Sequence, residues 1–585
     1  MTHRFALLRL LVLMSVCALG VSTASAAVFG DAAAAADDTT VLLGDPPRAS
    51  DALLQFFLPV PQGGAESERS KANQSSLTRA QVVALYNTLY VPGDSAAMGW
   101  TGSPSPTCIA GTTSAAYRQT ILDRVNFYRQ LAGLPTVGMF GDAAAQTGNA
   151  QASALMQGNN PWDGSANPHS PPPSWNCYTA GGALAAGKSN LAWGAAGPSA
   201  IRLYMDDYGT GNAPVGHRRW LLYPPLANVG TGDVNGATPA NDLWVLANGS
   251  DGTWGTRPAM PNGVAWPPGG YVPYQVLPSV SNRWSFSWPG ANMTAATVSI
   301  TKNGQPIAIL GYDARDNAGY GDASVVFRPD NSGAVAVSYA SPGAVDQDYV
   351  VTVSGMTGSG VPSSVTYTVT VIDPSITPPP TISGTISNGA TPVSGVSFCA
   401  QPSAGVSCTV SNASGVYSCT VPNGWGGVLH SPMVGGQRIP AQVFANVTGA
   451  VTRNVAATTG VPSCDLDVDD NGLFEAATDG LAILRRALGF GQASFAGLSG
   501  ACAANTTAAS IHGAANTSFN AGGYNVTGGG ATLATTDALV IIRTLLGLSG
   551  NAVVDGLGLS SKPGVVRTSW NDVKTWMNSN CRAGL

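Results

Sequence analysis

An acidic loop between residues 467 and 479 has the residue types and spacing of a cation site. Side-chain oxygens stand at positions 1, 3, 5 and 9 of the loop, and Gly472 stands at position 6, where a sharp turn is needed. Ca²⁺ takes carboxylate, amide and carbonyl oxygens at this spacing in loops that lead into a helix. The predicted Ca²⁺ ligands are Asp467, Asp469, Asn471, Leu473 through its carbonyl oxygen, Glu475 and Asp479.

The end of this loop departs from the usual calcium loop, because position 12 is Thr478 and the acid comes one residue later. Two interpretations remain open. The loop is one residue longer than usual, or Asp479 lies in the first turn of the next helix, where the helix dipole favours a carboxylate. A second copy of the helix start, Thr536 to Arg543, repeats the segment from Thr478 to Arg485. Its preceding loop has lost most of the acids, so we expect it to hold no ion.

Residues 464 to 550 resemble the dockerin and EF-hand-like repeats of secreted bacterial proteins, through the Asp-x-Asp-x-Asn-Gly loop followed by Thr-Asp-Gly-Leu. The resemblance implies a Ca²⁺-stabilised helical module that docks to a partner or to the cell surface. Whether that partner is a cohesin-like protein stays open. The apolar stripes of the two helices, around Leu484 and Leu488 in the first and Ile542 and Leu546 in the second, predict that the helices pack together.

Two histidines form a second candidate group. His169 follows a proline in a turn, and His217 begins a His-Arg-Arg-Trp-Leu-Leu segment, with Asp206 nearby in the sequence. Two imidazoles and a carboxylate with an open position suffice for Zn²⁺ or another divalent metal and lower the pKa of a bound water. His169, His217 and Asp206 are therefore candidate catalytic residues, with His169 and His217 as possible zinc ligands. A purely structural role for each histidine is equally open.

The segment from 115 to 250 is similar to the CAP superfamily of cysteine-rich secretory and pathogenesis-related proteins. The similarity rests on a helix with Asn126, Tyr128 and Arg129, the His169 turn, residues 187–192, and the run from 217 to 232. It implies an α-β-α sandwich in which two histidines and two acids line a cleft. The expected glutamate is replaced by Ser189, which has no carboxylate to act as a base.

The elements expected to position these groups change character along the chain. Helical periodicity predicts helices beginning near Thr78, over Tyr117 to Leu131 and over Ala143 to Gln157. From Trp254 onward β-branched and aromatic runs predict strands, with a hairpin turn at Asn303-Gly304. The predicted strands are Trp284–Trp288, Ala296–Lys302, Pro306–Leu310, Ala334–Tyr339, Tyr349–Val353 and Val365–Ile372.

These patterns predict a multidomain chain. Residues 1–26 have the anatomy of a signal peptide, and 27–75 form a low-complexity arm or pro-segment. An α-β-α sandwich of CAP type (76–252) precedes an Ig-like β-sandwich (253–373) and a Pro-rich linker (374–381). A second β-sandwich (382–458), similar to carboxypeptidase-regulatory and Cna-B modules, precedes the dockerin-like helical tail (459–585).

The composition of the chain excludes some classes of function. Only 10% of the 585 residues are charged, there are 72 glycines and 40 prolines, and the net charge is −5. Such a chain lacks the basic surface that nucleic acid requires, so we expect no nucleic-acid partner. No segment after the leader is long and apolar enough for an integral membrane span. Eight cysteines remain after removal of the leader, an even number that favours disulfides in an exported protein, with the pairing left open.

Three hypotheses follow for a secreted or cell-surface protein. The first is a non-catalytic binding protein, whose cleft recognises an unknown extracellular protein, glycan or lipid while the calcium-binding tail docks it. The alternative is a metal-assisted hydrolase of peptidase type that uses His169 and His217. A third hypothesis is a purely structural component of the envelope or matrix.

Overall fold

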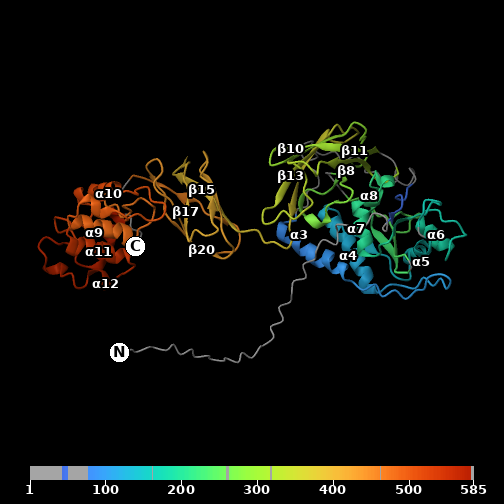
Figure 1. Cartoon of the computed structure of the whole chain (residues 1–585), viewed down its shortest axis with the longest axis horizontal. Coiled ribbons are helices and arrows are strands. Elements are labelled where there is room, and N and C mark those ends of the chain that lie inside the picture. The colour runs from blue at the N-terminus through green and yellow to red at the C-terminus, as the bar shows by residue number, and fades with distance from the viewer. Residues whose placement is uncertain are drawn as a thin grey trace, which may run out of the picture. The chain divides into compact units, whose positions relative to one another are not determined.

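The computed structural model describes residues 42–49, 77–160, 162–236, 238–258, 263–316, 319–460, 463–581 and 585. The predicted signal peptide and most of the predicted arm lie outside these ranges. The chain divides into two compact units, Met1–Ile376 and Thr377–Leu585, and the division falls within the predicted Pro-rich linker. Each unit is described by itself (Figure 1).

The first half of unit 1 is a mixed sheet with helices on both faces. The strand order is β1-β3-β5-β4-β2, and every pair is antiparallel except β2 with β4. The strands are β1 (Leu42–Leu43), β2 (Gly138–Met139), β3 (Ser189–Trp193), β4 (Asn228–Val234) and β5 (Ala240–Trp244). The helices are α3 (Arg79–Leu85), α4 (Ala115–Leu131), α5 (Ala145–Asn159), α6 (Ala180–Ala186), α7 (Pro198–Asp206) and α8 (Gly216–Leu221).

Close packing brings α5 and α7 onto opposite faces of this sheet. A Cβ on Gly232 of β4 would lie 2.1 Å from a backbone atom of α5, so only glycine allows this approach. On the other face, Tyr204 of α7 donates a hydrogen bond to Asn241 of β5. The predicted helix starts are confirmed at Thr78, whose side chain caps α3 with a capping box, and at α4 and α5 within two residues.

The second half of unit 1 consists of two sheets that share one apolar core with the first half. Their orders are β10-β9-β13-β14-β7 and β11-β12-β8-β6. The first sheet contains β7 (Gly270–Pro273), β9 (Thr297–Lys302), β10 (Gln305–Ile307), β13 (Gln347–Ser354) and β14 (Ser364–Ile372). The second contains β6 (Val264–Trp266), β8 (Trp284–Trp288), β11 (Ile309–Asp316) and β12 (Ala323–Pro329).

Four of the six predicted strands of this half are confirmed, as β8, β9, β13 and β14. The predicted strand Pro306–Leu310 is instead divided between the end of β10 and the start of β11, which belong to different sheets. The turn between β9 and β10 has positive φ at Asn303 and Gly304, as the sequence predicts. The prediction of a strand over Ala334–Tyr339 is wrong, since these residues form no ladder. Val337 N donates a hydrogen bond to Asp330 O, and Ser338 N donates one to the hydroxyl of Tyr349.

Unit 2 begins with small β-sheets. One sheet has the order β16-β15-β19-β18, with β23 and β24 also pairing with β15; a second is β17-β20-β22; a third pairs β21 with β25. The larger strands are β15 (Thr381–Asn388), β19 (Val416–Thr420), β20 (Trp425–His430) and β22 (Gln442–Val447). The short strands are β16 (Thr391–Pro392), β17 (Cys399–Gln401), β18 (Ser407–Cys408), β21 (Gln437–Arg438), β23 (Val451–Thr452), β24 (Val455–Ala456) and β25 (Thr458–Thr459).

The rest of unit 2 is helical. Its helices are α9 (Leu481–Ala487), α10 (Ala508–Asn520), α11 (Leu539–Leu545), α12 (Asn551–Val554) and α13 (Trp570–Asn580). As predicted, α9 and α11 pack together: a Cβ on Gly480 would lie 3.1 Å from Ile542. The predicted stripe is wrong at its end, because Leu488 and Leu546 follow the last helical residue and are exposed, while Ile483 and Ile541 are buried.

All eight cysteines that follow residue 26 are paired, which confirms the expectation of disulfides. The pairs are Cys108–Cys177, Cys399–Cys502, Cys408–Cys419 and Cys464–Cys581. Such bonds persist in oxidising compartments. Within the described residues, no helix combines the length and apolarity needed to cross a bilayer.

Candidate functional site

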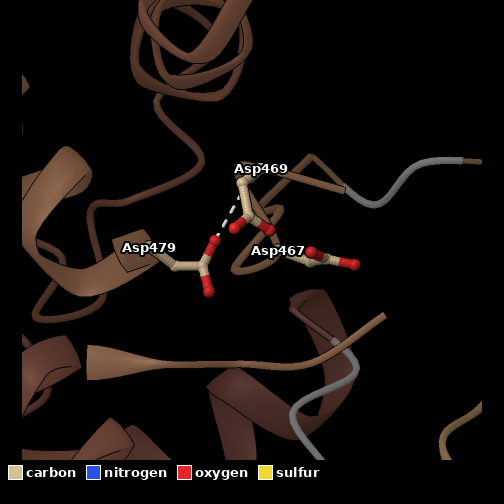
Figure 2. A group of neighbouring side chains, drawn as sticks. All are labelled: Asp467, Asp469 and Asp479. Carbon is tan, nitrogen blue, oxygen red and sulfur yellow. Dashed lines mark hydrogen bonds between the residues drawn. The ribbon is translucent and has the colours of Figure 1, made fainter. Parts of the chain in front are cut away.

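The acidic loop of unit 2 brings three aspartates together. One carboxylate oxygen from each of Asp467, Asp469 and Asp479 lies within 4.8 Å of the others, and all three residues are buried. Figure 2 shows Asp479 reaching from the start of the helix toward the loop that carries the other two. Asn471 is also buried beside them.

A π-helical turn accommodates the extra residue at the end of the loop. Residues Ala476–Gly480 form this wide turn before α9 begins, and it turns the side chain of Asp479 back toward the loop. Asp479 Oδ1 accepts hydrogen bonds from Val468 N at 2.7 Å and Asp469 N at 3.2 Å, and Oδ2 accepts one from Glu475 N at 2.8 Å. Asp479 thus lies in the first turn of the helical segment, as the second interpretation has it, and its carboxylate also bonds back to the loop. A calcium loop lengthened by one residue stays a prediction.

Backbone donors hold the other loop side chains in place. Asp467 accepts from Asn471 N at 2.9 Å and from Gly472 N at 3.0 Å, and Gly472 has φ of 87°. Asn471 Oδ1 accepts from Leu473 N, and its amide group donates to Glu475. The remaining predicted ligands, Leu473 and Glu475, are thus at the same loop but half-buried.

One carboxylate oxygen in the cluster is left over. Asp469 Oδ2 accepts a hydrogen bond from Gly500 N at 2.5 Å, whereas Asp469 Oδ1 is buried and has no hydrogen-bond partner among the described residues. A buried carboxylate oxygen without a donor is costly unless a cation or water satisfies it. The residue types and this oxygen without a donor fit a hard cation, which prefers oxygen ligands.

The raised pKa values of the three aspartates are a second observation that favours a bound cation. Burial raises the pKa of Asp467 to about 7, although the positive charge of Arg438 works against this. Burial, together with the negative charge of Asp469, raises the pKa of Asp479 to about 8. The pKa of Asp469 is raised as well, mainly by burial. The carboxylates therefore crowd enough negative charge into a buried space to favour a counter-charge.

Sequence reasoning missed the residue that supplies part of this counter-charge. Arg438, on β21, bonds to Asp465 at 2.6 Å and to Asp467 at 3.1 Å. Further contacts from the β-rich part reach the loop: Met433 N donates to Asp470, and His430 Nδ1 lies 2.7 Å from Asn471 O. No spacing in the sequence relates Arg438 to the loop, because the two meet only through the tertiary fold.

The second loop keeps the architecture without the acids. Residues Ala534–Ala538 form an equivalent π-helical turn, and Asp537 accepts hydrogen bonds from Thr527 N at 2.8 Å and Leu533 N at 2.9 Å. Arg567 donates to the carbonyl oxygens of Val526 and Asn525, and its charge interacts with that of Asp537. An arginine thus provides the positive charge in this loop.

The two histidines of unit 1 lie close enough for their charges to interact, but His217 is buried and His169 is half-buried. His217 is fully buried, its Nδ1 lies 2.8 Å from Asp207 Oδ1, and its ring stacks on Tyr204. His169 places Nδ1 2.5 Å from Ala186 O and Nε2 2.5 Å from Asp45 O. Burial lowers the pKa of His169, and the charge of His217 adds to this effect. With both ring nitrogens facing carbonyl oxygens, His169 offers no free lone pair to a metal in this arrangement.

The aspartate that contacts His217 is not the one predicted from the sequence. Asp207, rather than Asp206, contacts His217; Asp206 accepts hydrogen bonds from Val280 N at 3.1 Å and Ser281 N at 2.7 Å. Ser189 is buried in β3, and its hydroxyl interacts with the carboxyl group of Asp242. Asp207 ends α7 in the left-handed conformation, with φ of 58°, and this residue turns its carboxylate toward His217.

Comparisons with known proteins do not assign a family. No protein-family model matches the chain, and no curated protein matches it. Three solved structures each align with 30% of this chain: the Bacillus anthracis TIE protein (8% identity, 37% of that chain, TM-score 0.10), the group B streptococcus pilus 2b backbone protein (11%, 92%, 0.11) and the major pilin subunit of Bacillus cereus (8%, 64%, 0.09). The chain thus spans little more than a third of the TIE protein, and these TM-scores are too low to assign a fold.

Proposed function

We propose that the chain is an exported, non-catalytic binding protein, with a CAP-like unit at its N-terminal side and a Ca²⁺-stabilised, dockerin-like module at its C-terminal side. The observation that carries the proposal is the buried, unpartnered Oδ1 of Asp469 inside the three-aspartate cluster. Asp467, Asp469, Asn471, Glu475, Asp479 and the carbonyl of Leu473 would hold the ion.

Calcium would fix the module in two ways. It would neutralise buried carboxylates that are costly in its absence, and it would tie the loop before α9 to the start of that helix. Because Arg438 and Met433 contact the same loop, the ion would also support the junction between the β-rich and helical parts of unit 2. The paired cysteines support function in an oxidising compartment, outside the reducing cytosol.

The test is a calcium titration of the full chain. Isothermal titration calorimetry on chelator-treated protein should give one Ca²⁺ per chain, and Asp469→Asn should abolish or strongly weaken the binding. Asp537→Asn, in the second loop, is the matched control and should leave the stoichiometry at one. Absence of binding by the unmutated chain, or full binding by the Asp469 variant, would contradict the proposal.

The hydrolase alternative is less well supported, since His169 faces two carbonyl oxygens and His217 is sealed against Tyr204 and Asp207. Its distinguishing measurement is metal analysis of the purified chain. Stoichiometric zinc that disappears on His169→Ala with His217→Ala, together with lost peptide cleavage, would favour the hydrolase instead.

A further inference from the structure

A short segment from the predicted arm lies over the histidine site of unit 1. Residues 42–49, drawn in dark blue near α8 in Figure 1, start as strand β1 and continue as an extended strap. Leu42 and Leu43 pair in antiparallel fashion with Trp193 and Ala192 of β3. β1 is the terminal strand of the sheet, so this pairing covers an otherwise open edge of β3.

Backbone carbonyls of the strap are bound by side chains of the fold. Asp45 O lies 2.5 Å from His169 Nε2, and Pro47 O accepts a hydrogen bond from Trp220 Nε1 at 2.7 Å. Beyond them, Ala49 N donates to Gly319 O at 3.1 Å. These contacts recognise main-chain atoms, so they require an extended chain and leave the identity of most side chains free.

The burial pattern of the strap is that of a bound peptide. Leu43, Gly44, Pro46, Pro47 and Ala49 are buried, whereas Asp45 and Arg48 are exposed. The fold provides close-fitting surfaces at the buried positions. A Cβ on Gly216 would lie 2.4 Å from Pro46, and a Cβ on Gly44 would lie 3.2 Å from the ring of Trp193.

We propose that the groove formed by the edge of β3, His169, Trp220 and Gly216 is a receptor site for an extended, proline-containing peptide, and that residues 42–49 occupy it within the same chain. The ligand class is a segment with an apolar residue at the position of Leu43, glycine at that of Gly44 and two prolines at those of Pro46 and Pro47. The inference rests on the binding role proposed above for the CAP-like unit and names the ligand class of its cleft, but it uses no residue of the calcium loop.

The strap competes with any external peptide. A segment held in the same chain acts at an effective concentration on the order of millimolar, so a free peptide gains access only when the strap is weakened or removed. The strap is thus an internal ligand that keeps the site closed.

The test uses the full-length chain and a fluorescent peptide with the sequence of residues 42–49. Leu43→Asp with Pro46→Asp changes two buried strap positions and should release the strap; Asp45→Ser changes an exposed position and is the control. At about 100 µM protein, well below the effective concentration of the strap, fluorescence anisotropy should show binding to the released variant alone. Adding Trp220→Phe to the released variant should weaken peptide binding about fivefold, because one hydrogen bond to the ligand is lost.

Two results would overturn the inference: a folded released variant that does not bind the peptide, or a control variant that binds it as well. Should the released variant fail to fold, hydrogen exchange on the unmutated chain replaces it. Millimolar peptide should then speed the exchange of the amide groups of residues 42–49, and unchanged exchange rates would also overturn the inference. Calcium binding measured on the same samples separates this outcome from failure of the C-terminal module.

Discussion

Asp479 and Asp537 occupy equivalent positions in the two copies of the repeat, and each accepts backbone hydrogen bonds across a π-helical turn. Their surroundings differ in charge. Asp479 lies beside two further buried aspartates, whereas the charge of Asp537 interacts with that of Arg567. The same local structure thus contains three clustered carboxylates in the first copy, whereas an arginine lies beside it in the second copy.

Calcium should stabilise unit 2. A ligand that binds only the folded state at 100 times its dissociation constant adds about 2.7 kcal/mol to the free energy of unfolding. For a unit of this size we expect the melting temperature to rise by roughly 5–10 °C. Differential scanning calorimetry in calcium and in EGTA measures the change. An identical melting curve in both would exclude the calcium site.

Replacing Arg438 should increase the response to calcium. In Arg438→Gln, Asp465 and Asp467 lose their ion pairs, so the calcium-free unit is destabilised by about 3 kcal/mol, as expected when one partner of a buried pair is removed. Calcium then compensates part of this loss, and the calcium-dependent shift in melting temperature should exceed that of the unmutated chain. Arg486→Gln, which removes an arginine bonded to Asn516 in the same unit, should leave the shift unchanged.

The stability of unit 1 should fall as the pH rises from about 4 to about 8. Burial raises the pKa of Asp242 to about 8, an effect that Ser153 and Ser189 partly offset, while Asp233, with its own pKa raised by burial to about 6, adds to it. In the unfolded chain an aspartate titrates near 3.9, so between these values the folded state holds a proton that the unfolded state releases. Asp242→Asn should flatten the profile. Thermal unfolding followed by near-ultraviolet circular dichroism from pH 5 to 8 measures the slope; a rise in stability with pH over this range would contradict the assignment.

The disulfides should differ in their contribution according to the length of chain they enclose. Cys464–Cys581 closes a separation of 117 residues and Cys408–Cys419 one of 11. Loop-closure entropy predicts about 4.7 kcal/mol for a loop near 100 residues and about 3 kcal/mol for one near 15. Replacing the first pair by serines should therefore cost roughly 1–2 kcal/mol more than replacing the second, measured by urea unfolding of unit 2. Equal losses would show that strain or residual structure decides the effect.

Local patterns allowed much of this structure to be predicted. The capping box at Thr78, the Asn303-Gly304 hairpin and the repeat around Asp479 are set by residues close together in the sequence, and all three are found in the structure. The gathering of Asp467, Asp469 and Asp479 at one loop could be predicted for the same reason.

The rest depends on contacts between distant segments. Arg438, Arg567 and Gly500 reach the two loops from elsewhere in unit 2, and no sequence period relates them to their partners. The sequence identified Asp206 rather than Asp207 beside the histidine, because the left-handed end of α7 decides which carboxylate turns inward. The strap that contacts His169 belongs to a segment without periodicity in its sequence. Its binding to the fold could therefore not be predicted from local pattern.

Arg567 also bears on how the repeat would respond to calcium concentration under the proposed function. The arginine is covalently part of the chain, so its charge is present at every calcium level, and under the proposed function only the loop with Asp469 would bind calcium. Two linked calcium sites can fill cooperatively, whereas a module with a single calcium-binding loop would follow a simple hyperbola with a Hill coefficient of about one. Such a module would act as a graded stabiliser, and changes in the surrounding calcium would adjust its rigidity without a threshold.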